Sequence, residues 1–164
     1  MEKKLLLLFA AVAIIFSSCV KDSQSIVVGP KPVYDSLKYV AIDSASIATY
    51  LVNHPEISPV KDTLGMKYQI ITEGTGVYPT LASSVTVDYT GKLLDGTQFG
   101  TATNYTNTLS LLIQGWRVII PQLKVGTKFL LIIPSGLAYR EADTVPNVPP
   151  NSVLIFTITL KASK

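Results

Sequence analysis

Residues 89–100 read Tyr-Thr-Gly-Lys-Leu-Leu-Asp-Gly-Thr-Gln-Phe-Gly, and this stretch gives the clearest local indication of the fold. Asp95-Gly96 is a strong hairpin-turn signal, so the residues on its two sides are expected to pair as strands. The hairpin brings two aromatic residues, Tyr89 and Phe99, to one region. The next residue is Gly100, which has no side chain, and this raises the question of what the hairpin presents there.

Segments around this hairpin have the residue pattern of half-buried strands. Residues 84–89 place Val85, Val87 and Tyr89 on one face. A short helix is expected around Trp116, and no strand–helix–strand unit repeats. The sequence therefore predicts an α+β fold, in which an antiparallel five-stranded sheet curls around one short helix. The other strand candidates are residues 67–71, 129–133 and 153–160.

The chain begins with a segment typical of exported proteins. Met1 to Lys4 is a short basic start. The apolar run from Leu5 to Phe16 is shorter than the roughly 20 residues that span a bilayer. We therefore expect a signal peptide over residues 1–18.

Cys19 follows this segment and is the only cysteine of the chain, so it forms no intrachain disulfide. The sequence Phe-Ser-Ser-Cys over residues 16–19 resembles the lipobox of bacterial lipoproteins, in which the cysteine is lipidated and becomes the mature N-terminus. The resemblance implies a protein of the bacterial cell envelope, lipid-anchored to a membrane and facing the periplasm or the cell exterior. The alternative is an ordinary signal peptide followed by a free thiol.

Three segments follow the signal peptide. Residues 19–42 contain several serines and a Gly-Pro pair, and they are expected to form a lipid-anchored tether. Residues 43–65 are expected to form an N-terminal helix, capped by Asp43 or Ser44, and a linker. Residues 66–164 are expected to form the folded domain.

The charge balance argues against some classes of function. The chain has 14 basic and 11 acidic residues, and removal of residues 1–18 leaves 12 and 10, for a net charge near +2. This balance gives no electrostatic footprint for nucleic acid. Acidic residues are scattered singly and His54 is the only histidine, so we expect no metal and no cofactor.

Four separated motifs of the domain belong to one pattern. They are Val87-Asp88-Tyr89-Thr90-Gly91, Asp95-Gly96-Thr97-Gln98-Phe99, Leu112-Ile113-Gln114-Gly115-Trp116, and Leu137-Ala138-Tyr139 with Pro149-Pro150-Asn151 ten residues on. Together with Gly126, at the expected distance from Trp116, they resemble the FKBP-type peptidyl-prolyl cis-trans isomerases over residues 66–162. The resemblance implies an isomerase that assists the folding of exported proteins and binds X–Pro peptides in an apolar aromatic pocket.

Such an activity requires no nucleophile and no acid–base pair. An X–Pro bond isomerises over roughly tens to hundreds of seconds, because twisting it breaks amide resonance across a barrier of about 18–20 kcal/mol. A dry apolar pocket lowers this barrier by binding the twisted amide more tightly than the planar one. A few hydrogen-bond donors then orient the substrate carbonyls.

The resemblance also implies the roles of the pocket residues, although each aromatic taken alone is also compatible with a plain core position. Trp116 forms the floor under the proline ring, and the Tyr139 hydroxyl and the Ile113 N–H donate hydrogen bonds to the peptide. The catalytic set is Tyr89, Phe99, Trp116, Tyr139 and Phe156, and the substrate-binding set is Leu112, Ile113, Val148, Tyr105 and Gly100.

Three positions depart from the family pattern. Gly100 stands where aspartate is usual, so a charge and a side-chain hydrogen bond are missing. Ile119 replaces a common glycine shortly before Pro121, which suggests extra core burial or contact with the N-terminal helix. Arg140 replaces the glycine of a Tyr-Gly pair. Arginine does not adopt positive φ at low cost, so the loop after it is expected to take a different path or to present charge.

The sequence leaves two main functions open, besides a third, a purely structural surface lipoprotein whose pocket is filled by its own loop. One is a prolyl isomerase of weak to moderate activity on proline-containing polypeptide clients, because one lost polar contact costs about 1–3 kcal/mol. The other is a non-catalytic peptide-binding or chaperone module of the same fold. In both cases we expect a monomer that is attached to a membrane through its N-terminal lipid.

Overall fold

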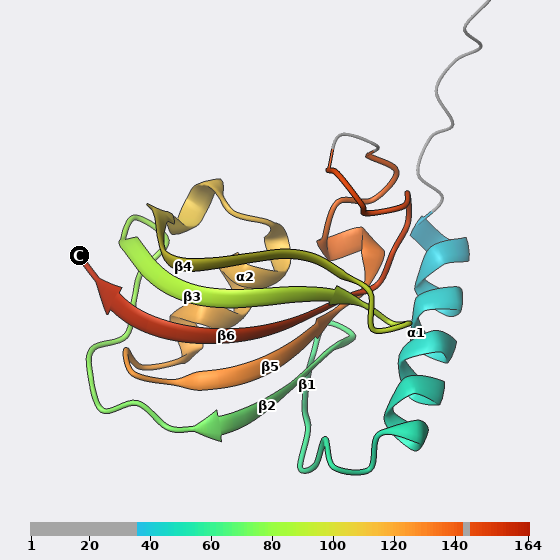
Figure 1. Ribbon diagram of the computed structural model, residues 1–164, viewed down its shortest axis with the longest axis horizontal. Helices are drawn as coiled ribbons and strands as arrows, with labels where there is room; N and C mark the ends of the chain where they lie inside the picture. Colours follow the sequence, from blue (N-terminus) through green and yellow to red (C-terminus); the bar gives the residue numbers. More distant parts are fainter. Residues whose placement is uncertain (1–35, 143–144) are drawn as a thin grey trace, which may run out of the picture. The chain divides into compact units, whose positions relative to one another are not determined.

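The computed structural model describes residues 36–142 and 145–164 (Figure 1). The expected signal peptide, Cys19 and the expected tether up to residue 35 lie outside the described residues. Those interpretations therefore stay predictions. Within the described part of the chain, no helix is long and apolar enough to cross a membrane.

Six antiparallel strands form one sheet, in the order β1-β2-β5-β6-β3-β4. The predicted α+β fold with an antiparallel sheet is confirmed. The sequence reasoning missed one short edge strand, β1. The strands are β1 (Lys61–Thr63), β2 (Met66–Thr72), β3 (Ser84–Leu93), β4 (Gln98–Thr108), β5 (Lys128–Ile133) and β6 (Leu154–Ser163).

Two α-helices lie on different sides of this sheet (Figure 1). The sheet curves around the short helix α2, whose residues Trp116 and Ile119 are buried. Ile119 lies in the core between α2 and the sheet. For this apolar segment the sequence suggested either extra core burial or contact with the N-terminal helix, and core burial is correct. The helical elements are α1 (Ser36–Asn53) and α2 (Gln114–Ile119), with 3-10 turns η1 (Leu109–Leu111), η2 (Ile120–Gln122) and η3 (Ser135–Leu137).

Alternation along β5 and β6 produces two apolar layers, because successive side chains of a strand point to opposite faces. On β5, Phe129 and Leu131 belong to the main core on the side of α2. Ile132 belongs to a second, smaller cluster on the other face, where it meets Ile47 of α1. The same division holds on β6, where Phe156 faces the main core and Ile155 faces the α1 cluster.

Helix α1 begins at Ser36, seven residues before the predicted start, so residues 36–42 are helix and not tether. The prediction that Asp43 or Ser44 caps the helix is therefore wrong. Asp43 lies inside the helix, on the face that packs against the domain, and its exposed fraction is only 2%. The sequence pattern suggested a local cap, but the carboxylate makes a long-range contact.

That contact joins α1 to the turn after β5. The Oδ2 atom of Asp43 accepts hydrogen bonds from the Ser135 backbone N–H and from the Ser135 hydroxyl, both at 2.8 Å. Ser135 is fully buried in η3. The carbonyl of Ser135 accepts the N–H groups of Ala138 and Arg140, so the buried carboxylate holds the first residue of a hydrogen-bonded turn.

The turn at Asp95-Gly96 joins β3 and β4 as predicted. Gly96 has a φ of 87°, and its N–H donates to the carbonyl of Leu93 at 3.0 Å. The Oδ1 atom of Asp95 accepts the N–H of Thr97 at 2.8 Å, which adds a side-chain bond to the turn. Both residues of the signal thus act as the turn chemistry requires.

Removal of the Asp43 carboxylate is expected to weaken the packing of α1. Asp43→Ala deletes two buried hydrogen bonds and should lower the free energy of unfolding by about 1–3 kcal/mol. Asp43→Asn should cost clearly less, because both bonds go to one oxygen that asparagine also provides. Urea-induced unfolding measures both variants, and an equal loss in the two would contradict the role of that single oxygen.

The turn between β1 and β2 offers an opposite, stabilising change. Leu64 and Gly65 have φ values of 55° and 79°, the pattern of a type I′ turn, and the Leu64 side chain is 68% exposed. Leu64→Asn should raise the free energy of unfolding by about 0.5–1 kcal/mol, because asparagine tolerates positive φ better than leucine. Leu64→Ala, which keeps the strain, is the control in the same unfolding experiment and should show no gain.

Candidate active site

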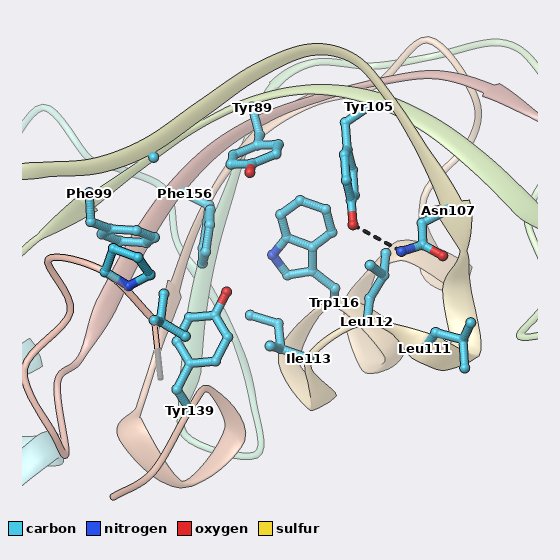
Figure 2. A pocket seen from close by; sticks show the side chains of 13 residues that line it. Tyr89, Phe99, Tyr105, Asn107, Leu111, Leu112, Ile113, Trp116, Tyr139 and Phe156 are labelled. Carbon is cyan, nitrogen blue, oxygen red and sulfur yellow. Dashed lines mark hydrogen bonds between the residues drawn. The ribbon is translucent and has the colours of Figure 1, made fainter. Parts of the chain in front are cut away.

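A cavity of about 360 Å³ opens between β3, β4, β6, α2 and the turn after η3 (Figure 2). Its lining is aromatic and aliphatic with few polar groups, and none of the residues described around it is charged. The lining consists of Tyr89, Phe99, Gly100, Tyr105, Asn107, Leu111, Leu112, Ile113, Trp116, Tyr139, Val145, Pro146 and Phe156.

Trp116 lies at the base of this cavity, in the first turn of α2, with an exposed fraction of 4%. Its ring centroid is 5.4 Å from that of Tyr89 and 5.3 Å from that of Phe156, with interplanar angles of 80° and 83°. These are edge-to-face contacts, the arrangement that aromatic quadrupoles favour. The indole is therefore held by two strands, β3 and β6, that approach α2 from the sheet.

Phe99 reaches the cavity because Gly91 leaves room for it. The Phe99 and Phe156 rings are perpendicular at 5.5 Å. A Cβ atom on Gly91 would lie 2.5 Å from Cζ of Phe99 and 3.0 Å from Cε1 of Phe156. Any side chain at position 91 would therefore displace both rings.

Gly100 of β4 pairs directly with Gly91 of β3, but the space around it is open. A Cβ atom there would meet only Tyr89, at 3.9 Å from Cε2 and 4.0 Å from the hydroxyl. These are ordinary contact distances, so the fold does not require a glycine at this position. The missing side chain is a feature of the cavity wall, beside the Tyr89 hydroxyl.

Tyr139 enters the cavity from the turn that Asp43 holds. The next residue, Arg140, has a φ of 56°, and its N–H donates to the carbonyl of Ser135 at 3.0 Å. The N–H of Asn151 donates in turn to the Arg140 carbonyl. Arginine adopts positive φ here despite its cost, and none of the residues described around the cavity presents the expected charge. The hydrogen bonds of its backbone N–H and carbonyl, and one from its Nε to the carbonyl of Gly136, hold Arg140 in the left-handed conformation.

Two tyrosines of the cavity, Tyr89 and Tyr139, keep their protons at neutral pH. Burial raises the pKa of the Tyr89 phenol above its ordinary value, and the neighbouring phenol of Tyr105 raises it further. Burial also raises the pKa of Tyr139, with added contributions from Tyr89 and Tyr105. Because the ordinary value is about 10, the hydroxyls of Tyr89 and Tyr139 are available as hydrogen-bond donors at neutral pH.

All the pocket residues predicted from the sequence line this cavity except Val148. Val148 is buried in the main core, and Val145 and Pro146 of the same loop form the wall instead. Four lining residues were not predicted from the sequence, namely Asn107, Leu111, Val145 and Pro146. Asn107 follows Tyr105 by two residues on β4, so the period-2 rule would have placed both side chains on one face.

The described residues do not form a site for a metal ion. Within residues 36–142 and 145–164, no three histidine, cysteine, aspartate or glutamate side chains come together. The cavity itself offers hydroxyl, amide and indole groups on an apolar surface. Such a lining suits the binding of an uncharged peptide segment, with a few polar contacts to fix its orientation.

Comparison with known proteins gives a consistent result. The family model of the FKBP-type peptidyl-prolyl cis-trans isomerases matches residues 76–161. The FKBP-type isomerase FkpA of Escherichia coli is 38% identical over 100 residues, which are 58% of this chain and 37% of that protein. FkpA of Aeromonas hydrophila is 37% identical over 118 residues, which are 69% of this chain and 44% of that protein.

Solved structures have the same fold. The crystal structure of FkpA from Escherichia coli matches with a TM-score of 0.67 and 33% identity, over 78% of this chain and 62% of that one. A peptidyl-prolyl cis-trans isomerase from Pseudomonas syringae matches with a TM-score of 0.65 and 28% identity, over 83% of this chain and 99% of that one. The chain spans less than half the length of the two curated relatives named above. The matched region covers just over half of the chain, and the chain therefore belongs to the family of FKBP-type peptidyl-prolyl cis-trans isomerases.

Proposed function

We propose that this protein catalyses the cis-trans isomerisation of X–Pro bonds in polypeptides. The observation that carries the proposal is Trp116 at the base of an uncharged aromatic cavity. Water stabilises the planar, dipolar amide, so a proline ring held on the indole would leave that stabilisation behind. The cavity would then bind the twisted amide in preference to the planar one.

The pocket residues have different roles in this proposal. Trp116 is the floor, Tyr89, Phe99 and Phe156 are the walls, and the Tyr139 hydroxyl and the Ile113 N–H donate to substrate carbonyls. Leu112 completes the apolar surface. Val148 supports the wall from the core, and Tyr105 and Gly100 border the site on the β4 side.

The location of this activity is inferred from the first residues of the chain. A signal peptide over residues 1–18 and a lipid on Cys19 would attach the protein to a membrane of the bacterial cell envelope. Its clients would then be exported polypeptides that contain proline. We infer a monomer, attached through a single N-terminal lipid group.

A protease-free assay with an Ala-Leu-Pro-Phe tetrapeptide tests the activity. The protein should accelerate relaxation of the cis fraction well beyond the uncatalysed rate, which corresponds to roughly tens to hundreds of seconds. Near-UV circular dichroism verifies that the sample is folded. A folded protein that leaves the relaxation unchanged contradicts the proposal, and peptide binding without turnover would favour the non-catalytic alternative.

Gly100→Asp should increase kcat/KM by about tenfold. A carboxylate at this position would lie beside the Tyr89 hydroxyl and would supply a polar contact of about 1–1.5 kcal/mol. Gly100→Ala is the matched control, because it stiffens the strand without adding a polar group. If both variants gain equally, the effect comes from the backbone and not from the hydrogen bond.

The pH profile of kcat/KM should be flat from roughly pH 6 to pH 9. The ionisable groups described around the cavity are tyrosines. The pKa values of the Tyr89 and Tyr139 phenols are raised, so these two phenols lose their protons only as the pH rises above about 10. Tyr139→Phe should lower kcat/KM about fivefold and keep the flat profile. A titration with a midpoint near neutral pH would show that an unassigned acid or base takes part.

A further inference from the structure

Tyr105 and Asn107 form a polar pair on the β4 wall of the cavity. They are two residues apart on one strand, so their side chains share a face, and both line the cavity. Figure 2 shows them on the far side of Trp116 from Phe99 and Tyr139. The Tyr105 ring also packs edge-on against Tyr89, with the centroids 5.8 Å apart.

The orientation of the Asn107 amide is fixed by its neighbour. The backbone N–H of Thr108 lies 2.8 Å from one amide atom of Asn107, and because an N–H only donates, that atom must be the oxygen Oδ1. The other atom is then Nδ2, and it lies 2.9 Å from the Tyr105 hydroxyl oxygen. The NH₂ group only donates, so the Tyr105 oxygen is the acceptor.

This direction determines what the Tyr105 hydroxyl offers to a ligand. Its oxygen accepts from Asn107, so its own proton takes no part in that bond and is available to another acceptor. A hydroxyl that accepts one hydrogen bond is also polarised into a better donor. The pair therefore presents a directed donor at the wall of a cavity whose other polar side chains are few.

We propose that Tyr105 donates a hydrogen bond to a backbone carbonyl of the bound X–Pro peptide and that Asn107 is the positioning residue that sets the direction of this bond. The inference rests on the proposed function. It gives the site a side-chain contact on the β4 wall, where Gly100 contributes none. Peptide recognition would thus use donors on two sides of the indole, Tyr139 on one and Tyr105 on the other.

The experiment measures peptide binding separately from turnover. Trp116 is the only tryptophan of the chain and lies in the cavity, so its fluorescence reports the binding of an Ala-Leu-Pro-Phe peptide to the full-length protein. Tyr105→Phe and Asn107→Leu should each raise the Kd about three- to tenfold. The double variant should resemble Tyr105→Phe alone, because Asn107 acts through Tyr105.

Asn107→Asp is the decisive variant. Aspartate has the shape of asparagine and retains a contact with Tyr105, but its oxygens only accept, so the Tyr105 proton would turn toward the carboxylate. We expect it to weaken binding at least as much as Asn107→Leu. Thr106→Val serves as the control, since Thr106 lies on the other face of β4 and pairs with Thr86.

The two proposals fail in different ways. Wild-type affinity in Tyr105→Phe, or in Asn107→Asp, would show that the pair only supports the wall and would overturn the inference. A wild-type protein that binds the peptide without isomerising it would overturn the proposed function alone. A wild-type protein that neither binds nor isomerises the peptide would overturn both.

Discussion

The site depends on the packing of the Trp116 indole between Tyr89 and Phe156. The two partners come from the neighbouring strands β3 and β6, and both meet the indole nearly at right angles. This contact fixes α2 to the sheet, and the same indole lines the cavity. Core and site therefore share residues, so a change that loosens the packing also alters the surface on which a proline ring would rest.

The two paired glycines of the β3–β4 hairpin differ in whether the surrounding structure requires a glycine. Gly91 is required by sterics, because Phe99 and Phe156 occupy the space of a side chain. Gly100 has open space beside Tyr89 and an unstrained backbone. The same residue type thus marks a packing constraint at one position and an unfilled polar position at the other. Only the distances around each glycine distinguish the two cases.

Helix α1 is joined to the site through a short chain of hydrogen bonds. Asp43 binds Ser135, and Ser135 closes the turn in which Tyr139 and Arg140 lie. The helix also covers the outer face of β5 and β6 with Ile47. Helix α1 is therefore part of the folded domain, and Asp43 joins it by hydrogen bonds to the turn that carries Tyr139.

The antiparallel sheet, the hairpin at Asp95-Gly96 and all six aromatic residues of the cavity could be predicted from the amino-acid sequence. The sheet and the hairpin follow from local rules, strand alternation and turn chemistry, whereas the cavity residues were implied by the resemblance to a known family. Only the folded chain defines the role of Asp43, the conformation of Arg140 and the direction of the hydrogen bond between Asn107 and Tyr105. Rules based on the sequence alone treat a carboxylate near a helix start as a cap and predict that arginine is unfavourable at positive φ. They do so because they consider only the residue and its neighbours along the chain. For Asp43, a buried partner 92 residues away reverses that preference, and for Arg140 the hydrogen bonds of the surrounding turn do so. Both sets of contacts are defined only once the chain has folded.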